Sequence, residues 1–394
     1  MEISGKHYHS IWTSECDADN PPVINIIDQT LLPYEFVVVQ LHTVEGAISA
    51  ICDMQVRGAP LIGATGAYGL YLALKVDNSN QVLLEAHDQL LASRPTAVNL
   101  RWALDKLKSK LLDCAPGQRA NLALQMANDI CSTDVDMCSA MGDHGLKIIK
   151  NLYANKIANG ANEANEEGTD NDSPPVVNIL THCNAGWLAT VDWGTALAPI
   201  YKAHAEGVPV HVWVDETRPR NQGAYLTTWE LDQQGVPHTL IVDNAGGHLM
   251  QQGLVDMCIV GTDRTTRSGD VCNKIGTYLK ALAAFDNDVP FYVAAPSPSI
   301  DWTISDGLKD IPIEQRSRDE VAHLNGITVG PNAGVAGVVR IVPDHIQIRN
   351  DAFDTTPARL ITGLITERGT CKATEAGLAK LFPELSNAGT QNDN

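Results

Sequence analysis

Apolar residues recur at helical spacing through most of the first 157 residues of the chain. The spacing predicts an amphipathic helix in each of six segments: 43–56, 61–75, 81–92, 99–112, 119–130 and 134–157. Two short apolar runs precede them, VINIIDQTLLP at 23–33 and EFVVVQ at 35–40, and each is typical of a strand. We therefore expect a mainly helical N-terminal domain with a few strands, covering residues 1–158.

The pattern changes at residues 159–175, NGANEANEEGTDNDSPP. This segment is acidic, rich in Gly and Asn, and ends in two prolines. It has no apolar periodicity that could bury a face, so it predicts a flexible, solvated loop at the boundary between two domains.

Short apolar strands alternate with amphipathic helices in the second half of the chain. We expect strands at 176–182, 210–216, 238–244, 257–263 and 290–296, and helices at 195–207, 224–235, 247–253 and 274–286. Continuous apolar strands between helices are typical of a parallel sheet covered on both faces. Residues 176–385 are therefore predicted to form an α/β domain, and the polar tail 386–394 is predicted to be disordered.

A parallel sheet also predicts where a ligand binds, because ligands lie beyond the carboxyl ends of its strands. Six residues of suitable chemistry follow predicted strands: Cys183, Asp215, Glu216, Asp243, Asp263 and Ser297.

Charge and motif content narrow the class of function. The chain has 394 residues with a formal net charge of −19, so its long-range field disfavours nucleic acid and anionic membranes. No apolar stretch is long enough for a membrane span or a signal peptide. The nine cysteines form no CxxC pair, which favours reduced thiols in an intracellular protein over disulfides or a zinc site. A P-loop and a GxGxxG fingerprint are both missing, so no nucleotide cofactor is expected.

Two side chains are candidates for the chemical step. Cys183, in HCNAG at 182–186, follows a strand and precedes a predicted helix, where a helix dipole would polarise the thiol. Asp263, in GTDR at 261–264, also follows a strand, and apolar surroundings can raise the pKa of a carboxyl group so that it acts as a general acid or base. A buried structural cysteine and a helix-capping aspartate are the alternatives.

Several residues suit an anionic or hydroxyl-rich ligand. Arg57 opens the segment RGAP before a predicted helix, and Arg94 lies on a loop that enters another, so a guanidinium and helical N–H groups could hold a phosphate. Asn273 and Lys274 are predicted to open the helix at 274–286. The polar segment DETRPRNQGAYLT at 215–227 offers Gln222 among five candidates, the others being Asp215, Glu216, Arg218 and Arg220. Close helix packing and solvated surface charges are the alternative explanations.

Seven segments together resemble the methylthioribose-1-phosphate isomerase family of methionine salvage. They are MQVRGAPLIGATGAYG (54–69), SRPTAVNL (93–100), LTHCNAGWLAT (180–190), VWVDETRPRNQGAYLT (212–227), GTDRTTRSGDVCNKIGTY (261–278), FYVAAPSPSID (291–301) and FDTTPARLITGLITERG (353–369). The resemblance runs almost end to end. That family is related to the alpha, beta and delta subunits of translation initiation factor 2B and to ribose-1,5-bisphosphate isomerases.

The resemblance implies a fold, a reaction and a set of site residues. The fold is a mainly helical N-terminal domain with a few strands joined to a Rossmann-like parallel-sheet C-terminal domain, usually in a homodimer. The reaction is an aldose–ketose isomerisation of 5-methylthio-α-D-ribose 1-phosphate to 5-methylthio-D-ribulose 1-phosphate, without an exogenous cofactor or metal. Asp263 matches the proton donor and Cys183 the residue that stabilises the transition state. The positions that match substrate binding are Arg57, Gly58, Ala59, Arg94, Gln222, Asn273 and Lys274.

Three questions stay open at this stage. Hydrogen can move between C2 and C1 through an enediol or as a hydride, and the sequence does not choose between the two. A non-catalytic regulatory protein and a bisphosphate isomerase are the alternative functions. The acidic segment 159–175 resembles a eukaryotic decoration, which predicts a nuclear fraction besides a cytoplasmic one.

Overall fold

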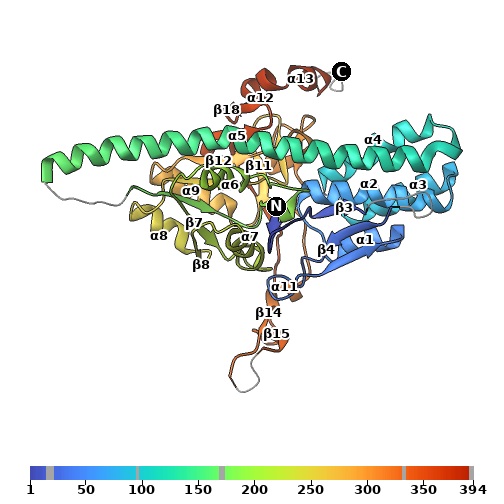
Figure 1. Cartoon of the computed structure of the whole chain (residues 1–394), viewed down its shortest axis with the longest axis horizontal. Helices are drawn as coiled ribbons and strands as arrows, with labels where there is room; N and C mark the ends of the chain where they lie inside the picture. Colours follow the sequence, from blue (N-terminus) through green and yellow to red (C-terminus); the bar gives the residue numbers. More distant parts are fainter. Residues whose placement is uncertain (15–21, 95–96, 168–173, 331–333, 390–394) are drawn as a thin grey trace.

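The computed structural model describes residues 1–14, 22–94, 97–167, 174–330 and 334–389. Its two ends are built differently: a bundle of helices forms one end, and a sheet with helices on both faces forms the other (Figure 1). A single long helix runs along both parts.

The N-terminal part is a helical bundle with a small antiparallel sheet beside it, as expected. The sheet has the order β3–β4–β5, and a two-stranded hairpin, β1–β2, precedes it. The strands are β1 (Glu2–Ile3), β2 (Lys6–His7), β3 (Ile11–Thr13), β4 (Ile24–Ile27) and β5 (Val38–Leu41), and the first helices are α1 (Val44–Cys52), α2 (Ala59–Val76), α3 (Asn80–Ser93) and α4 (Val98–Leu112). Helix α2 is central to the bundle and buries nearly all of its residues, which explains its run of Gly and Ala.

Helix α5 (Arg119–Glu167) corrects the expected boundary between the domains. The segments 119–130 and 134–157 form one continuous helix, which also includes 159–167 of the expected loop. The helical backbone therefore continues into the stretch that the sequence predicted to be a loop. Residues 168–173 lie outside the described part of the chain.

The C-terminal part contains a seven-stranded sheet with the order β18–β17–β12–β9–β6–β7–β8. All neighbours are parallel except β17 and β18. The strands are β6 (Val177–Thr181), β7 (Val210–Asp215), β8 (His238–Ile241), β9 (Met257–Val260), β12 (Phe291–Ala294), β17 (Gly363–Thr366) and β18 (Gly369–Cys371). Apart from the edge strand β18, this is the strand order of a Rossmann fold, with its switch point between β6 and β9.

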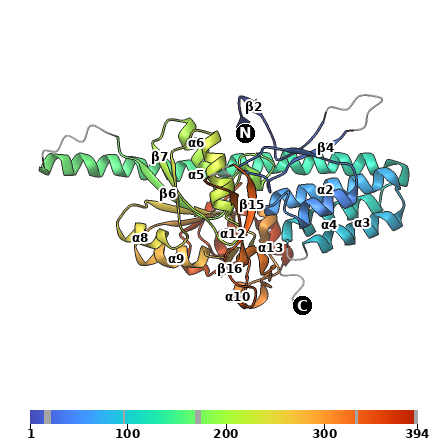
Figure 2. The ribbon, with the colours of Figure 1, turned by 90° about the horizontal axis from the view of Figure 1, so that it is seen from below.

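Helices cover both faces of this sheet (Figure 2). They are α6 (Ala198–Ala205), α7 (Thr228–Gln233), α8 (Ala245–Gln251) and α9 (Thr277–Asp286), with α5 packed against α6 and β17. The expected helix at 224–235 begins as a π-helical turn over Gly223–Thr227 before α7.

A second, four-stranded sheet was not expected from the sequence. Its order is β13–β10–β11–β16, with β10 (Arg264–Thr266), β11 (Val271–Lys274), β13 (Ile300–Asp301) and β16 (Phe353–Thr356). Asn273 and Lys274 therefore lie on a strand, paired with Asp354 and Phe353, and do not open a helix. Helix α9 begins only at Thr277, because Gly276 in the left-handed region separates it from the strand.

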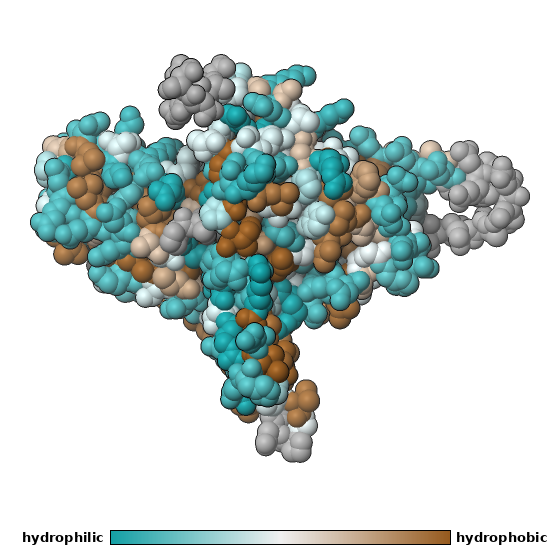
Figure 3. All heavy atoms as spheres, turned by 180° about the vertical axis from the view of Figure 1, so that it is seen from behind, coloured by the Kyte–Doolittle hydropathy of each residue, from teal (hydrophilic) through white to brown (hydrophobic). Residues whose placement is uncertain are grey.

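The remaining elements extend the C-terminal part outward. The hairpin β14 (His323–Ile327) and β15 (Ala336–Arg340) projects from the body (Figures 1 and 3), and the short helix α11 (Asp319–Ala322) packs on β14. The short helix α10 (Gly307–Asp310) precedes α11 in the chain. Helices α12 (Glu375–Leu381) and α13 (Pro383–Gly389) follow the last strand. Helix α13 covers 386–389 of the expected disordered tail, and residues 390–394 lie outside the described part.

Candidate active site

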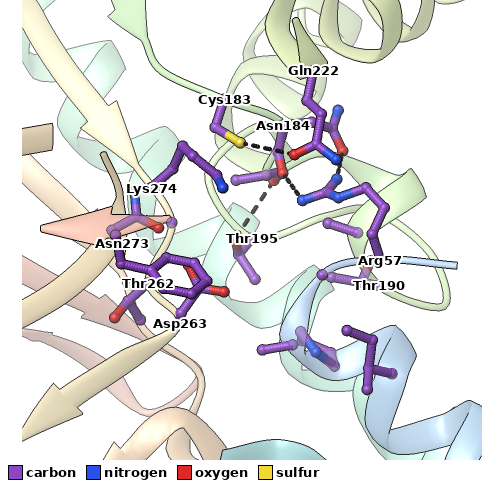
Figure 4. Close-up of a pocket in the computed structure, with 18 of the residues that line it drawn as sticks. Arg57, Cys183, Asn184, Thr190, Thr195, Gln222, Thr262, Asp263, Asn273 and Lys274 are labelled. Atoms are coloured by element: carbon purple, nitrogen blue, oxygen red, sulfur yellow. Dashed lines mark hydrogen bonds between the residues drawn. The ribbon is translucent and has the colours of Figure 1, made fainter. Parts of the chain in front are cut away.

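A cavity of about 690 Å³, including the part open to solvent, lies between the helical bundle and the carboxyl ends of the parallel strands. All nine residues that the family resemblance selected line it: Arg57, Gly58, Ala59, Arg94, Cys183, Gln222, Asp263, Asn273 and Lys274. Figure 4 shows side chains of the two domains facing each other across this space. Neither domain alone encloses the cavity.

The N-terminal domain contributes the start of helix α2. Gly58 precedes the helix with φ of 89°, and a Cβ atom there would lie 2.3 Å from the carbonyl oxygen of Ala189. Only glycine fits that backbone and that close approach. No side chain caps this 18-residue helix, and Pro60 has no N–H, so the N–H groups of Ala59 and Leu61 are the ones able to bind an anion at the cavity wall.

Arg57 reaches the cavity through a buried polar network. Its Nη1 donates to Oδ1 of Asn184, and its Nη2 donates to the carbonyl oxygen of Asn184 at 2.7 Å. The amide of Asn184 in turn donates to Glu230 Oε1 at 2.9 Å. Glu230 is completely buried and also accepts from the N–H groups of Trp187 and Leu188 and from the hydroxyl of Tyr201. The carboxylate of Glu230 thus balances the guanidinium of Arg57 through one bridging amide.

The second arginine approaches from the end of helix α3. Arg94 donates from Nη2 to Glu314 Oε2 at 3.0 Å, and its side chain is 11% exposed. This ion pair joins the helical bundle to the C-terminal domain and keeps a positive charge at the cavity.

Hydrogen bonds fix both the N–H and the carbonyl oxygen of Cys183. Its N–H donates to Thr217 Oγ1 at 2.8 Å, and its carbonyl oxygen accepts from Thr227 Oγ1 at 2.7 Å. Its φ of 65° is unusual for a residue with a side chain, so these bonds help to maintain a strained backbone. The thiol points at Gln222, with 3.5 Å between Sγ and Oε1 (Figure 4).

The expected helix dipole at Cys183 is not present. The next helical residues are a single turn at Trp187–Ala189, and α6 begins only at Ala198. The cationic neighbour of the thiol is instead the ammonium group of Lys274, which interacts electrostatically with both Cys183 and Asp263. Lys274 extends from β11 over the ring of Phe353, 4.9 Å from its centroid.

The pKa of Asp263 is raised, chiefly because burial disfavours the carboxylate. The positive charges of Lys274, Arg94 and Arg57 oppose this shift. Burial likewise lowers the pKa of Lys274, against the attraction of Cys183 and Asp263. The cavity therefore holds a carboxyl group that keeps its proton to higher pH than a free aspartate.

The other residues selected at strand ends do not line this cavity. Asp215 is fully buried beneath it and pairs with His182 Nδ1 at 2.9 Å and Lys280 Nζ at 3.0 Å. Asp243 accepts from the N–H groups of Thr217 and Arg218. Of the five candidates in 215–227, only Gln222, just before the π-helical turn, lines the cavity.

Four supporting residues were not selected from the sequence: Asn184, Thr217, Thr227 and Glu230. Asn184, Thr217 and Thr227 lie inside quoted motifs, but their partners are distant in the sequence. Glu230 lies outside the quoted motifs, on the expected helix at 224–235, and only its burial against Asn184 and Tyr201 gives it a role.

Comparison with known proteins is consistent with this geometry. Residues 55–373 match the model of the initiation factor 2 subunit family. The chain is 58% identical over 388 residues to methylthioribose-1-phosphate isomerase of Rhodospirillum rubrum, covering 98% of this chain and 95% of the relative. A crystal structure of 5-methylthioribose 1-phosphate isomerase from Pyrococcus horikoshii has a TM-score of 0.77 at 38% identity, with 96% and 97% of the two chains covered. A translation initiation factor eIF-2B delta subunit from A. fulgidus has a TM-score of 0.73 at 36% identity, with 96% and 100% covered.

These matches define the class of protein first. The chain belongs to the initiation factor 2 subunit family, whose members share its helical domain and Rossmann-like sheet. Within that class, it belongs to the methylthioribose-1-phosphate isomerase family, as the sequence motifs predicted.

Two observations concern membrane spans and the location of the protein in the cell. None of the helices in the described part of the chain is long and apolar enough to cross a membrane. Bacterial relatives align over nearly the whole chain, so the acidic segment gives no support for a eukaryotic source or a nuclear fraction.

Proposed function

We propose that this protein isomerises 5-methylthioribose 1-phosphate to 5-methylthioribulose 1-phosphate. The observation that carries the proposal is the arrangement of Cys183 and Asp263 in one cavity, with the ammonium group of Lys274 acting on both. An acid and a polarisable nucleophilic atom in one enclosed site are what ring opening followed by hydrogen transfer requires.

The phosphate is proposed to bind at the start of helix α2. The free N–H groups that follow Gly58 supply partial positive charge, and the guanidinium groups of Arg57 and Arg94 lie beside them, each with a carboxylate partner on its far side. This placement supports a phosphate on C1, because the anion then orients the reacting end of the sugar. Orientation of this kind can contribute several kcal/mol to the barrier.

Ring opening is the first step in this proposal. Because the phosphate blocks O1, the bond between C1 and the ring oxygen breaks only if that oxygen is protonated. Asp263, whose pKa is raised, transfers its proton to the ring oxygen as the bond to C1 weakens. The positive charge that develops at C1 is then next to the sulfur of Cys183.

Hydrogen transfer from C2 to C1 completes the isomerisation. In the hydride route, hydrogen moves with its electron pair while the C2 hydroxyl loses its proton, and Cys183 stabilises the cationic species. In the enediol route, Cys183 removes the C2 proton to give an enol, then returns a proton to C1 while the C2 hydroxyl gives its own proton to the carboxylate of Asp263 and becomes the ketone. Product formed in deuterium oxide distinguishes them, since only the enediol route exchanges the migrating hydrogen with solvent.

The decisive experiment is isomerisation of the purified substrate without added cofactor or metal. We expect ketose from the wild-type protein and a loss of at least about 100-fold in kcat for Asp263→Asn and for Cys183→Ser, both folded. Matched controls are Asp286→Asn, which changes an exposed residue, and Cys114→Ser, just after helix α4, because neither residue lines the cavity. Near-normal turnover in either site variant would reject its role.

The same assay addresses the alternative functions. A bisphosphate isomerase would turn over ribose 1,5-bisphosphate faster than the methylthio sugar. A regulatory protein would bind the sugar phosphate without forming ketose. Either result from folded wild-type protein would replace the proposal.

We further propose that the protein works as a homodimer in the cytoplasm. The support for the homodimer is the resemblance to the family alone. Sedimentation equilibrium should give twice the chain mass of 42.4 kDa. A monomer at micromolar concentration would reject the dimer, and fractionation of the native cell would test the location.

A further inference from the structure

A cluster of two histidines and a buried aspartate lies outside the cavity. His7 ends strand β2, and His9 follows two positions later, so both are carried by the N-terminal residues. Their rings meet edge to face, with 5.0 Å between the centroids. Asp192 lies on the loop after β6, and its side chain is only 4% exposed. The cluster thus forms where the start of the chain packs on that loop.

The distances within the cluster match those of a metal site. Nε2 of His7 lies 3.3 Å from Nε2 of His9 and 3.1 Å from Oδ2 of Asp192. The three ligand atoms all lie within 4.8 Å of one another. Two atoms bound to a tetrahedral zinc ion at about 2.0–2.1 Å are about 3.3 Å apart. Two edges of a coordination tetrahedron are therefore already formed.

The aspartate is oriented for such a role by its other oxygen. Oδ1 accepts from the Met1 α-amino group at 2.8 Å and from the N–H of Trp193 at 2.7 Å, which directs Oδ2 at the two rings. The α-amino group also lies 3.4 Å from Nδ1 of His7 and donates to the carbonyl oxygen of Tyr8 at 2.9 Å. His7 is half-exposed, so an ion can reach the site from solvent.

A second group of metal-ligating residues provides a contrast. His182, Asp215 and Asp243 also come together, but they are buried beside the ammonium group of Lys280, 3.0 Å from Asp215. There the ammonium group and the imidazole bond the same carboxylate oxygen, Oδ2 of Asp215. In the His7 cluster the Met1 α-ammonium pairs with Oδ1 of Asp192, and Oδ2 faces His7, whose side chain is 55% exposed.

We propose that His7, His9 and Asp192 bind one zinc ion, with solvent as the fourth ligand. Two imidazoles and a carboxylate suit Zn²⁺ better than Mg²⁺ or Ca²⁺, which prefer oxygen ligands. The ion joins the N-terminal residues to the loop that carries Ala189, Thr190 and Thr195 of the cavity wall. Its role is structural, because no ligand faces the reacting atoms. The expectation of no zinc site was based on the spacing of the cysteines, and that criterion does not detect a His-x-His pair.

The test uses the full-length protein stripped with a chelator and then titrated with ZnCl₂ by calorimetry. We expect one ion per chain and an increase in Tm on binding. His7→Gln and His9→Gln should each raise the dissociation constant at least about tenfold and remove the increase in Tm. Matched controls are His345→Gln and Cys52→Ser, which change an exposed histidine and an exposed thiol elsewhere.

Co²⁺ provides a second measurement that does not depend on the stability of the variants. Bound to the wild-type protein, it should give the visible bands of a tetrahedral site without thiolate charge transfer. Absence of stoichiometric binding, unchanged binding in both histidine variants, or a thiolate spectrum would each overturn the proposal. None of these outcomes bears on the isomerase proposal, because Cys183 and Asp263 are not ligands.

Discussion

At the scale of the residue, the buried carboxylate of Glu230 does not line the cavity, yet it balances the charge of Arg57, which does line it. Glu230 has no direct contact with Arg57, yet Asn184 links the two through bonds at both ends. An isolated buried charge lowers the stability of the folded protein, so the charges of Glu230 and Arg57 are tolerated only when both are present. Binding of an anion by Arg57 therefore depends on a residue of helix α7.

Glu230→Gln tests this dependence. The substitution keeps the size of the side chain but removes the charge that balances Arg57, and it places an NH₂ group near the N–H donors of Trp187 and Leu188. We expect KM to rise about tenfold or more, which corresponds to ~1.4 kcal/mol, with a smaller change in kcat. Steady-state kinetics with Asp232→Asn as control, an exposed residue on the same helix, gives the comparison. A change confined to kcat would contradict the linkage.

A second residue-scale prediction concerns stability against pH. Burial raises the pKa of Asp134 to about 7, against a bond from the N–H of Val191 at 2.7 Å. A folded pKa above the unfolded value means that the folded protein binds more protons between about pH 4 and 7. The free energy of unfolding should therefore fall as pH rises through this window and then level off.

Asp134→Asn should remove this contribution. Asparagine can still accept from Val191 and carries no charge to bury, so the variant should gain stability relative to wild type at pH 8 compared with pH 5. Urea unfolding at both pH values measures the difference, and Asp136→Asn, exposed on the same helix, is the control. Equal differences at both pH values would show that Asp134 does not titrate in this range.

Most residues that line the candidate site were predictable from the sequence, but the residues that hold them in position were not. Strand ends and motifs point to Cys183 and Asp263 because a parallel sheet exposes its carboxyl ends. Glu230 and Thr217 act through partners more than thirty residues away, and no local pattern encodes such a pairing. Lys274 was placed at a helix start because the segment 274–286 has helical apolar spacing, whereas pairing with Phe353 makes it part of a strand.

At the scale of the element, helix α5 is the clearest difference between expectation and structure. Hydrophobic periodicity predicted two helices and a loop, but one helix packs on α2 at one end and on α6 at the other. The two halves pack against different domains, yet buried positions such as Ala127, Asp134 and Met141 keep one helical spacing along the helix, so the break expected at 131–133 has no counterpart in the burial pattern. The small sheet escaped prediction because its strands are short and partly polar.

The contact between α5 and α6 gives an element-scale prediction. A Cβ atom at Gly145 would lie 2.3 Å from Cγ of Pro199, a rigid ring at the start of α6. Gly145→Ala gains about 1 kcal/mol of helix propensity but must separate the two helices. We expect a net loss of about 1–3 kcal/mol in the free energy of unfolding, measured by urea titration. Asn151→Ala, exposed further along α5, should instead be neutral or stabilising, and equal effects of both substitutions would contradict the close packing.

At the scale of the whole molecule, the cavity depends on both domains being in place. Arg57 and Arg94 come from the helical bundle, whereas Cys183 and Asp263 come from the α/β domain. Helix α5 packs on both, and the pair Arg94–Glu314 crosses between them. The two domains should therefore unfold as one cooperative unit, although each has its own hydrophobic core.

Substrate binding to the Asp263→Asn protein tests this coupling without turnover. Ligand at 100 times its dissociation constant adds about 2.7 kcal/mol to the free energy of unfolding, and the whole transition should shift together because both domains hold the ligand. Calorimetry should show one endotherm that moves upward as substrate is added. Arg57→Met in the same background should lose the shift, since the phosphate then lacks a charge from the bundle. Two endotherms, with only one of them responding to substrate, would mean that a single domain carries the binding site.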